Sequence, residues 1–211
     1  LLDAPPRQRV PMRKAINHLK KADPVLGAII ARVGPYRIKY REPVFETLVR
    51  SIIFQQLSGK AAATIYNRVA AATGEPIAPD GILGLGAERM RALGLSRQKI
   101  AYITDLAERT ASGEIDFAAC VGWDDAEVLR RFTAVKGIGV WTVQMFLMFA
   151  LRRPDVLPTG DLGLRAAAKK AYGYDEAPPP KELERIGAAW APYRSVASWY
   201  LWRSLEESPD L

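Results

Sequence analysis

Cysteine and histidine are almost absent from the sequence, which holds one of each, Cys120 and His18, among 211 residues. A single cysteine rules out a disulfide within the chain, a Cys-ligated zinc site and an iron–sulfur cluster held by this chain alone. One histidine does not by itself build a metal site or a conventional catalytic triad. These absences exclude disulfide- and cluster-based chemistry within the chain and fit a reducing, intracellular setting.

Long apolar runs are missing as well. No stretch of 18 or more apolar residues occurs, and the first ten residues, LLDAPPRQRV, lack the apolar core of a signal peptide. We therefore expect a soluble protein that is not exported and has no membrane partner. Apolar residues still make up 49% of the chain, which is enough for a sizeable core in one domain or two small lobes.

Positive charge is in excess, with 30 Lys and Arg residues against 23 Asp and Glu residues. The excess is uneven along the chain, because residues 1–110 hold 18 basic and 9 acidic residues, whereas residues 111–211 hold 12 and 14. A basic surface is what a polyanionic partner such as nucleic acid requires, although ordinary solubility uses the same charges.

Helical periodicity runs through nearly the whole chain, and strand signals are poor. The only alternating stretch is YRIKYRE, residues 36–42. Asp23 is placed to cap one helix, and residues 42–57, EPVFETLVRSIIFQQL, predict another. Ser58 is then the cap of a further helix that Gly74 ends. The pattern predicts an all-α protein.

Two glycines, Gly137 and Gly139, interrupt this helical pattern within FTAVKGIGVWTVQMFLMFA. A dinucleotide-binding turn would need a third glycine where Thr142 stands and a strand before the turn, and the preceding segment is helical. A plain helix–helix turn is a common use of glycine. A helix-hairpin-helix that grips a DNA phosphate uses glycine to bring bare N–H groups close to the anion, and Lys136 adds positive charge.

The longer stretch FTAVKGIGVWTVQMFLMFALRRPDVLPTGDLGLRAA resembles the helix-hairpin-helix DNA glycosylases, the HhH-GPD superfamily, and most of all the 3-methyladenine DNA glycosylase II type. FETLVRSIIFQQLSGKAAATIYNRV, LGLSRQKIAYITDLA and WAPYRSVASWYLW resemble other family segments in family order, so the likeness covers most of the chain. One departure is Lys136, where many members have proline. The resemblance implies two helical lobes around a DNA-binding cleft, one of residues 45–153 and one of residues 1–44 plus 154–211.

Asp161 precedes LGLRAAAKKAYG, and by its local pattern it is a good helix N-cap. The resemblance implies that it is also the catalytic carboxylate, because the family places its catalytic Asp at this spacing after the hairpin. Such a carboxylate stabilises the positive charge that develops on the sugar as the N-glycosidic bond breaks, and it directs or deprotonates a water. The nearest rival, Asp155, fits a turn or capping role better.

The resemblance also implies that the enzyme hydrolyses without cutting the strand. Bifunctional members carry a Schiff-base lysine two residues after the second hairpin glycine, and Trp141 stands there in this chain. We therefore expect a monofunctional glycosylase with no lyase activity.

Base capture is assigned by matching family segments. The expected base-pocket residues are Trp141, Met145 and Trp202, and Met145 stands where relatives often have tyrosine. An aromatic cleft would hold a cationic or electron-poor alkylpurine by stacking and cation–π attraction. Leu57 with Gln56 matches the wedge that fills the duplex after base flipping, although Leu57 also fits the end of a buried helix stripe.

The hairpin is expected to contact the DNA backbone and a monovalent cation. The positions that match the phosphate contacts are Lys136, Gly137, Gly139 and Thr142. The positions whose main-chain carbonyls match the ligands of a structural Na+ or K+ are Thr133, Val135 and Ile138. We expect no required cofactor and no iron–sulfur cluster.

The expected function is excision of alkylated purines (3-methyladenine, 7-methylguanine and ethenoadenine) from damaged double-stranded DNA, by base flipping and N-glycosidic hydrolysis in base excision repair. We expect a monomer, located in the cytoplasm at a bacterial nucleoid or in a eukaryotic nucleus. Two alternatives stay open. One is a non-catalytic helix-hairpin-helix DNA-binding module in which Asp161 is only a cap, and the other is a glycosylase for oxidised or deaminated bases.

Overall fold

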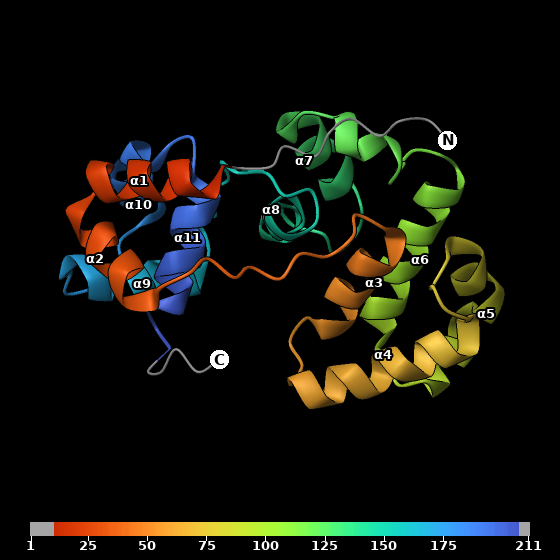
Figure 1. Ribbon diagram of the computed structural model, residues 1–211. Coiled ribbons are helices and arrows are strands. Elements are labelled where there is room, and N and C mark those ends of the chain that lie inside the picture. Colours follow the sequence, from red (N-terminus) through yellow and green to blue (C-terminus); the bar gives the residue numbers. More distant parts are fainter. Residues whose placement is uncertain (1–10, 207–211) are drawn as a thin grey trace. The chain divides into compact units, whose positions relative to one another are not determined.

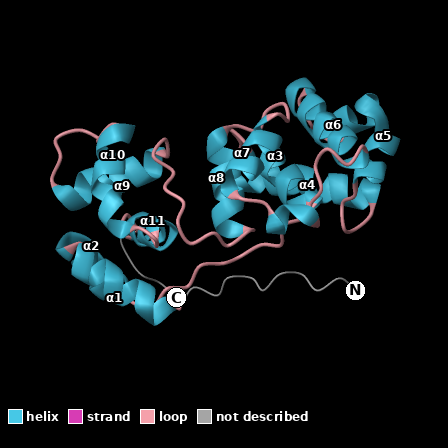
Figure 2. Ribbon diagram, turned by 90° about the horizontal axis from the view of Figure 1, so that it is seen from above, coloured by secondary structure: helices cyan, strands magenta, loops and turns pink. Residues whose placement is uncertain are grey.

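The protein is built from helices. The computed structural model describes residues 11–206, and within that range it contains eleven α-helices, two short 3-10 helices and no strand (Figure 1). Figure 2 shows that loops alone join these helices within the described range. The prediction of an all-α chain is confirmed.

The chain divides into two compact units. Among the described residues, one comprises residues 41–146 and is called the hairpin unit. The other comprises residues 11–40 and 147–206 and is called the Asp161 unit. The chain passes between the two units twice, once between residues 40 and 41 and once within α8 (Val140–Phe149).

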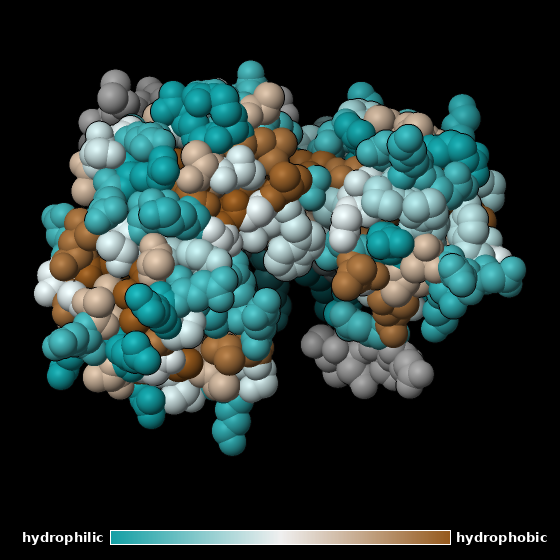
Figure 3. Space-filling view, turned by 180° about the vertical axis from the view of Figure 1, so that it is seen from behind, coloured by the Kyte–Doolittle hydropathy of each residue, from teal (hydrophilic) through white to brown (hydrophobic). Residues whose placement is uncertain are grey.

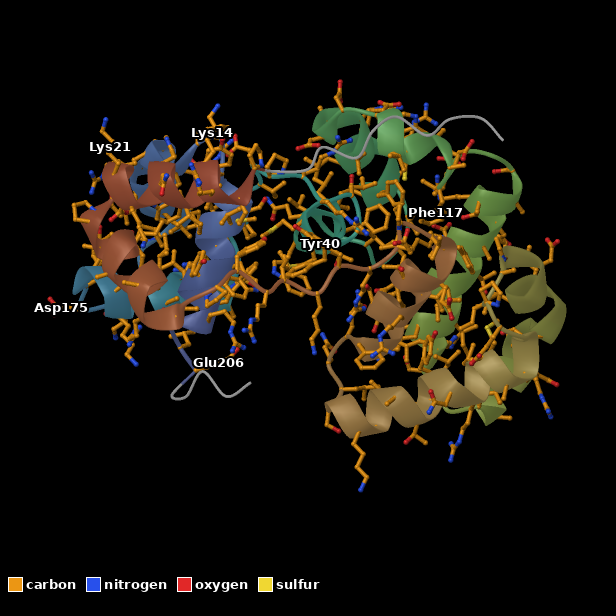
Figure 4. The ribbon with its side chains drawn as sticks, viewed as in Figure 1. Lys14, Lys21, Tyr40, Phe117, Asp175 and Glu206 are labelled. Carbon is orange, nitrogen blue, oxygen red and sulfur yellow. The ribbon has the colours of Figure 1, made fainter. Side chains whose placement is uncertain are left out.

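The hairpin unit packs around a cluster of aromatic rings. Its other helices are α3 (Phe45–Phe54), α4 (Gly59–Thr73), α5 (Pro79–Ala92), α6 (Arg97–Ala111), η1 (Ala119–Gly122) and α7 (Asp125–Thr133). Phe117, labelled in Figure 4, makes edge contacts with Phe45, Phe132 and Phe146 at centroid distances of 6.3, 5.6 and 6.1 Å. Edge-to-face packing of this kind adds stability beyond the area buried.

One predicted helix is shorter than expected. The pattern of residues 42–57 predicts helix up to Leu57, but α3 ends at Phe54, and Gln56 adopts a left-handed φ of 55°. The cause lies outside the segment, because the Lys99 ammonium on α6 binds two main-chain oxygens where the helix stops. The accepting carbonyls belong to Ile53 (2.6 Å) and Gln55 (2.7 Å).

The Asp161 unit is held together by a buried carboxylate. Its helices are α1 (Met12–Ala22), α2 (Pro24–Val33), α9 (Leu162–Tyr172), α10 (Pro180–Gly187), η2 (Ala188–Trp190) and α11 (Arg194–Arg203). Asp23 caps α2 as predicted, accepting from the Leu26 N–H at 3.0 Å. It also accepts from the Tyr172 hydroxyl at 2.6 Å and from the indole of fully buried Trp190 at 2.8 Å. A single side chain thus joins α2, α9 and η2.

The basic surplus belongs to the Asp161 unit. Residues 41–146 hold 12 basic and 12 acidic residues, whereas residues 11–40 and 147–206 hold 16 basic and 8 acidic ones. Counting charges by sequence halves does not show this surplus, because the Asp161 unit combines segments from both halves of the chain. Lys14 and Lys21 of α1 point away from their unit (Figure 4).

Apolar side chains do not form one broad exposed area on the face that Figure 3 shows, where hydrophilic residues surround small separate patches. Within residues 11–206, none of the helices combines the length and the apolar character that a bilayer-spanning helix requires.

Candidate active site

The glycines at 137 and 139 form the turn between α7 and α8, and they differ in what their backbone demands. Gly137 has a left-handed φ of 75°, and a Cβ there would lie 2.0 Å from Cδ2 of Tyr102. Gly139 lies outside the left-handed region, and a Cβ there would meet nothing within 4 Å. Gly137 is therefore required by the fold, whereas the folded protein by itself does not require Gly139.

Main-chain N–H groups of this turn are available to a ligand. Within residues 11–206, the N–H groups of Gly137, Gly139 and Val140 have no hydrogen-bond acceptor. Val140 begins α8 and is 56% exposed. Bare N–H groups at the positive end of a helix dipole suit an anion.

Asp105, on α6, braces the hairpin. Its Oδ2 accepts from the Lys136 N–H at 2.9 Å, the Lys136 ammonium lies 3.6 Å from Oδ1, and Arg109 Nε lies 3.1 Å from Oδ2. Burial alone would raise the pKa of Asp105, but these hydrogen bonds and positive charges outweigh it and lower the pKa. The bond from the Lys136 N–H could not form with proline at this position. Sequence reasoning missed Asp105 because no local pattern marks it.

The turn after α3 is tied to the hairpin. The Gln55 side-chain amide donates to the Gly137 carbonyl at 3.0 Å. Leu57 and Gln56, the predicted wedge residues, both lie in this turn, and Leu57 is 40% exposed. Leu57 is therefore not the end of a buried helix stripe.

Two of the predicted base-pocket residues share a cavity. Trp141, 49% exposed, and Met145 line a hollow of about 490 Å³ in the hairpin unit. The other lining residues are Arg41, Arg50, Ser51, Phe54, Gln55, Gln56 and Thr142. Thr142, a predicted phosphate contact, is buried against this cavity.

Asp161 is held at the start of α9 by two donors. Its Oδ1 accepts from the Leu164 N–H at 2.6 Å and from the Trp202 indole N–H at 2.8 Å. The Trp202 ring stacks on Phe149 with centroids 6.1 Å apart. A Cβ on Gly163 would lie 3.2 Å from Asp161 Oδ1 and 3.5 Å from Trp202 Cδ1, so glycine leaves room for the indole.

This assembly extends what the sequence predicts. The N-cap role of Asp161 is confirmed, and Trp202, predicted only as a base-pocket residue, contacts this carboxylate directly. Phe149 and Gly163 were missed. The signal for Gly163 was a glycine placed inside a helix, where it costs stability unless close packing needs it.

Asp155 has a structural role. Its carboxylate binds the Arg194 guanidinium at 2.7 and 2.8 Å and accepts from the Arg194 N–H at 3.2 Å. Burial would raise the pKa of Asp155, but Arg194 outweighs it and lowers the pKa. Because Arg194 begins α11, Asp155 caps that helix from outside it, and so helps to position Trp202. This agrees with the predicted capping role.

A comparison with protein families decides which family the chain represents. The model of the HhH-GPD superfamily of base excision DNA repair proteins matches residues 49–192, which is well over half of the chain. The chain belongs to the HhH-GPD superfamily. The predicted helix-hairpin-helix glycosylase fold is thereby confirmed.

Several relatives within the HhH-GPD superfamily share most of their length with this chain. The Schizosaccharomyces pombe protein DNA-3-methyladenine glycosylase 1 is 35% identical over 200 residues, covering 92% of this chain and 87% of its own. A putative DNA-3-methyladenine glycosylase of Bacillus subtilis is 31% identical, with coverages of 92% and 70%.

Solved structures agree with these relatives. A 3-methyladenine DNA glycosylase of S. pombe in complex with abasic DNA aligns with a TM-score of 0.81 and 34% identity, covering 94% of this chain and 99% of that one. A DNA-3-methyladenine glycosidase of Bacillus halodurans aligns with a TM-score of 0.84 and 39% identity, covering 95% and 92%.

The three residues whose carbonyls are expected to bind a cation make hydrogen bonds within the described part of the chain. The Val135 carbonyl accepts from the Ile138 N–H at 3.1 Å, and the Thr133 hydroxyl donates to the Leu129 carbonyl at 2.6 Å. No group of three or more His, Cys, Asp or Glu side chains within residues 11–206 is arranged to hold a metal ion. A cation at this hairpin would therefore depend on main-chain oxygens.

Proposed function

We propose that the protein is a monofunctional DNA glycosylase that excises alkylated purines from double-stranded DNA in base excision repair. The observation that carries this proposal is Asp161, held by two hydrogen bonds in a chain whose relatives are named for 3-methyladenine excision. This carboxylate supplies the chemistry that hydrolysis needs.

Asp161 acts on the sugar. As the bond between C1′ and the base breaks, positive charge develops on the deoxyribose, and a fixed carboxylate stabilises it. The Leu164 N–H and the Trp202 indole orient the carboxyl group. The carboxylate then directs or deprotonates the water that attacks C1′. A cationic alkylpurine leaves as a neutral base, so no strong general acid is needed, in keeping with a chain that has one histidine.

The hairpin unit holds the DNA strand. The N–H groups of Gly137, Gly139 and Val140 bind a backbone phosphate, with the Lys136 ammonium beside them. Leu57 enters the space that the flipped base leaves. The flipped base is received by the residues around Trp141.

A residue exchange at the active centre tests the catalytic assignment. Asp161→Asn keeps a capping oxygen, because Asn caps helices about as well as Asp. We expect it to lower the rate of base release from methylated duplex DNA by roughly 100-fold or more, and to retain binding to a duplex with an abasic-site analogue. Asp175→Asn, on an exposed loop position, is the matched control and should keep wild-type activity.

The same assay separates the other two functions. Wild-type protein that binds the abasic-site duplex but releases no base of any kind would be a DNA-binding module. Wild-type protein that releases oxidised or deaminated bases, and no methylated ones, would be a glycosylase of different specificity. A covalent enzyme–DNA adduct trapped by borohydride would contradict the absence of lyase activity, because Trp141 cannot form an imine.

We also propose that the carbonyls of Thr133, Val135 and Ile138 bind Na+ or K+ and that the protein acts as a monomer. Replacing K+ by the bulkier tetramethylammonium ion at equal concentration should weaken binding to the abasic-site duplex. Equal affinity for the abasic-site duplex in both salts would show that DNA binding does not require a cation at the hairpin. Sedimentation equilibrium measures the oligomeric state, and a mass near 23.3 kDa is expected.

A further inference from the structure

One face of α6 contacts both the hairpin and the turn that carries the predicted wedge. Lys99, Tyr102 and Asp105 follow one another at intervals of three residues, so their side chains lie on the same side of the helix. Asp105 accepts from the Lys136 N–H, and the Tyr102 ring lies against Gly137. Lys99 is the third member of this row, and it reaches the turn that follows α3.

The ammonium of Lys99 binds main-chain oxygens. It donates to the carbonyls of Ile53 at 2.6 Å and Gln55 at 2.7 Å, at the end of α3, where helix carbonyls have no partner within the helix. Within residues 11–206, no carboxylate forms an ion pair with Lys99. Partial burial lowers the pKa of Lys99, and the two carbonyls offset the water that its charge loses.

The wedge turn, residues 55–58, does not take its shape from local preference. Gln56 has a φ of 55°, in a region that residues other than glycine rarely occupy. The apolar pattern of the sequence favours helix up to Leu57 instead. The two hydrogen bonds from Lys99 oppose that helical alternative, because they hold carbonyls on both sides of the point where the helix ends.

A cavity beside the wedge turn leaves room for the turn to change its conformation. It measures about 430 Å³, and Leu57, Lys99 and Gly137 are among its lining residues. The Gln55 side-chain amide donates to the Gly137 carbonyl at 3.0 Å. The position of the exposed Leu57 side chain relative to the hairpin is therefore fixed by contacts from α6 and from the hairpin itself, all within the hairpin unit.

We propose that Lys99 is a positioning residue for base flipping, which keeps Leu57 where it enters the duplex beside the phosphate that the hairpin binds. The inference rests on the proposed glycosylase function and on Leu57 as the wedge. Without the ammonium, part of the population takes the helical form of the turn. The rate of base release from paired DNA then falls in proportion to the fraction of molecules that keep the wedge turn. Lys99 itself does not act on the sugar or the base.

Single-turnover release of 7-methylguanine from two duplexes tests the proposal. In one duplex the lesion is paired with cytosine. In the other it is a bulge with no nucleotide opposite, so its extrusion breaks no base pair and leaves no gap for a wedge. We expect Lys99→Met to slow release from the paired duplex by roughly tenfold or more, and release from the bulge by less than about twofold. Lys99→Arg keeps donors for both carbonyls and should restore most of the rate.

A matched control removes the same charge elsewhere. Lys21→Met, at an exposed position of α1 (Figure 4), should change neither rate. Urea unfolding of each variant shows that the compared proteins are folded. If Lys99→Met does not fold, Lys99→Gln, which keeps a neutral donor, takes its place with the same expected pattern and the same refuting results.

Other outcomes overturn the proposal in distinguishable ways. If Lys99→Met slows release from both duplexes equally, Lys99 contacts DNA or supports the whole unit, and the positioning role is refuted. Wild-type rates in Lys99→Met, or no recovery in Lys99→Arg, also refute it, and in each of these cases the glycosylase function stands. If wild type releases 7-methylguanine from neither duplex, the proposed function fails for this base and the inference fails with it.

Discussion

Replacing each hairpin glycine by alanine separates the fold from DNA binding. Both Gly137 and Gly139 belong to one short turn, yet a Cβ at Gly137 would collide with the Tyr102 ring at 2.0 Å, whereas a Cβ at Gly139 would meet nothing within 4 Å. Gly137→Ala should therefore damage the folded protein. Gly139→Ala should leave the folded protein intact and block only a ligand that approaches the bare N–H groups.

The magnitudes follow from the backbone and the contacts. A non-glycine residue in the left-handed region costs about 1–2 kcal/mol, and overpacking against a ring costs a further 1–3 kcal/mol or so. Gly137→Ala should then lower the free energy of unfolding by about 2–5 kcal/mol. Gly139→Ala should change it by less than about 1 kcal/mol, in either direction. Loss of one charge-assisted hydrogen bond to phosphate, about 1.5–3 kcal/mol, weakens DNA binding by roughly tenfold or more.

Two measurements on both variants decide the matter. Urea unfolding reports stability, and fluorescence anisotropy with an abasic-site duplex reports affinity. The expected pattern is a stable Gly139→Ala variant with weak DNA binding and an unstable Gly137→Ala variant. Wild-type affinity in Gly139→Ala would mean that the turn only joins two helices. Wild-type stability in Gly137→Ala would mean that Tyr102 moves aside at little cost.

Three further variants test other contacts. Trp202→Phe keeps an aromatic ring but removes the indole N–H that donates to Asp161, so excision should slow by about tenfold or more. An unaltered single-turnover rate would show that this hydrogen bond is dispensable. Asp105→Asn should destabilise the hairpin by about 1–3 kcal/mol at pH 7. The folded-state pKa of Asp105 lies below its usual value, so the extra stability of wild type over the Asn variant should be lost as pH falls below about 4. Urea unfolding at pH 7 and pH 3 measures this. An equal stability difference at both pH values would show that the ionised carboxylate does not stabilise the hairpin through Lys136. Leu57→Ala should lower the free energy of unfolding by less than about 1 kcal/mol, because the side chain is 40% exposed. It should nevertheless slow excision from fully paired duplex by roughly tenfold. Equal excision rates in the variant and wild type would show that Leu57 does not act as a wedge.

Features fixed by neighbouring residues could be predicted from the sequence. The caps at Asp23, Ser58 and Asp161 each accept a hydrogen bond from the N–H three residues later, as the local pattern indicates. The start of α8 at Val140 follows from the glycines before it. The hairpin itself needed only a short motif, since its turn geometry is encoded by residue type.

Features that depend on distant residues could not be predicted. Lys99 stops α3 and Asp105 braces the hairpin, and nothing near either partner in sequence announces these contacts. The bond from Trp202 to Asp161 joins residues on different helices, and it requires Gly163 to leave space for the indole. Local patterns give the elements, whereas such long-range hydrogen bonds depend on how helices pack.

The concentration of positive charge in the Asp161 unit has a consequence for how the protein would meet a chromosome. Charge-driven attachment to a duplex releases counterions and weakens as ionic strength rises, whatever the sequence. The hairpin unit, with 12 basic and 12 acidic residues, has no such surplus, and its N–H groups act only at hydrogen-bond range. If the Asp161 unit supplies this charge-driven attachment, raising the salt should weaken binding to undamaged DNA more than it weakens the hydrogen bonds between the hairpin N–H groups and a phosphate.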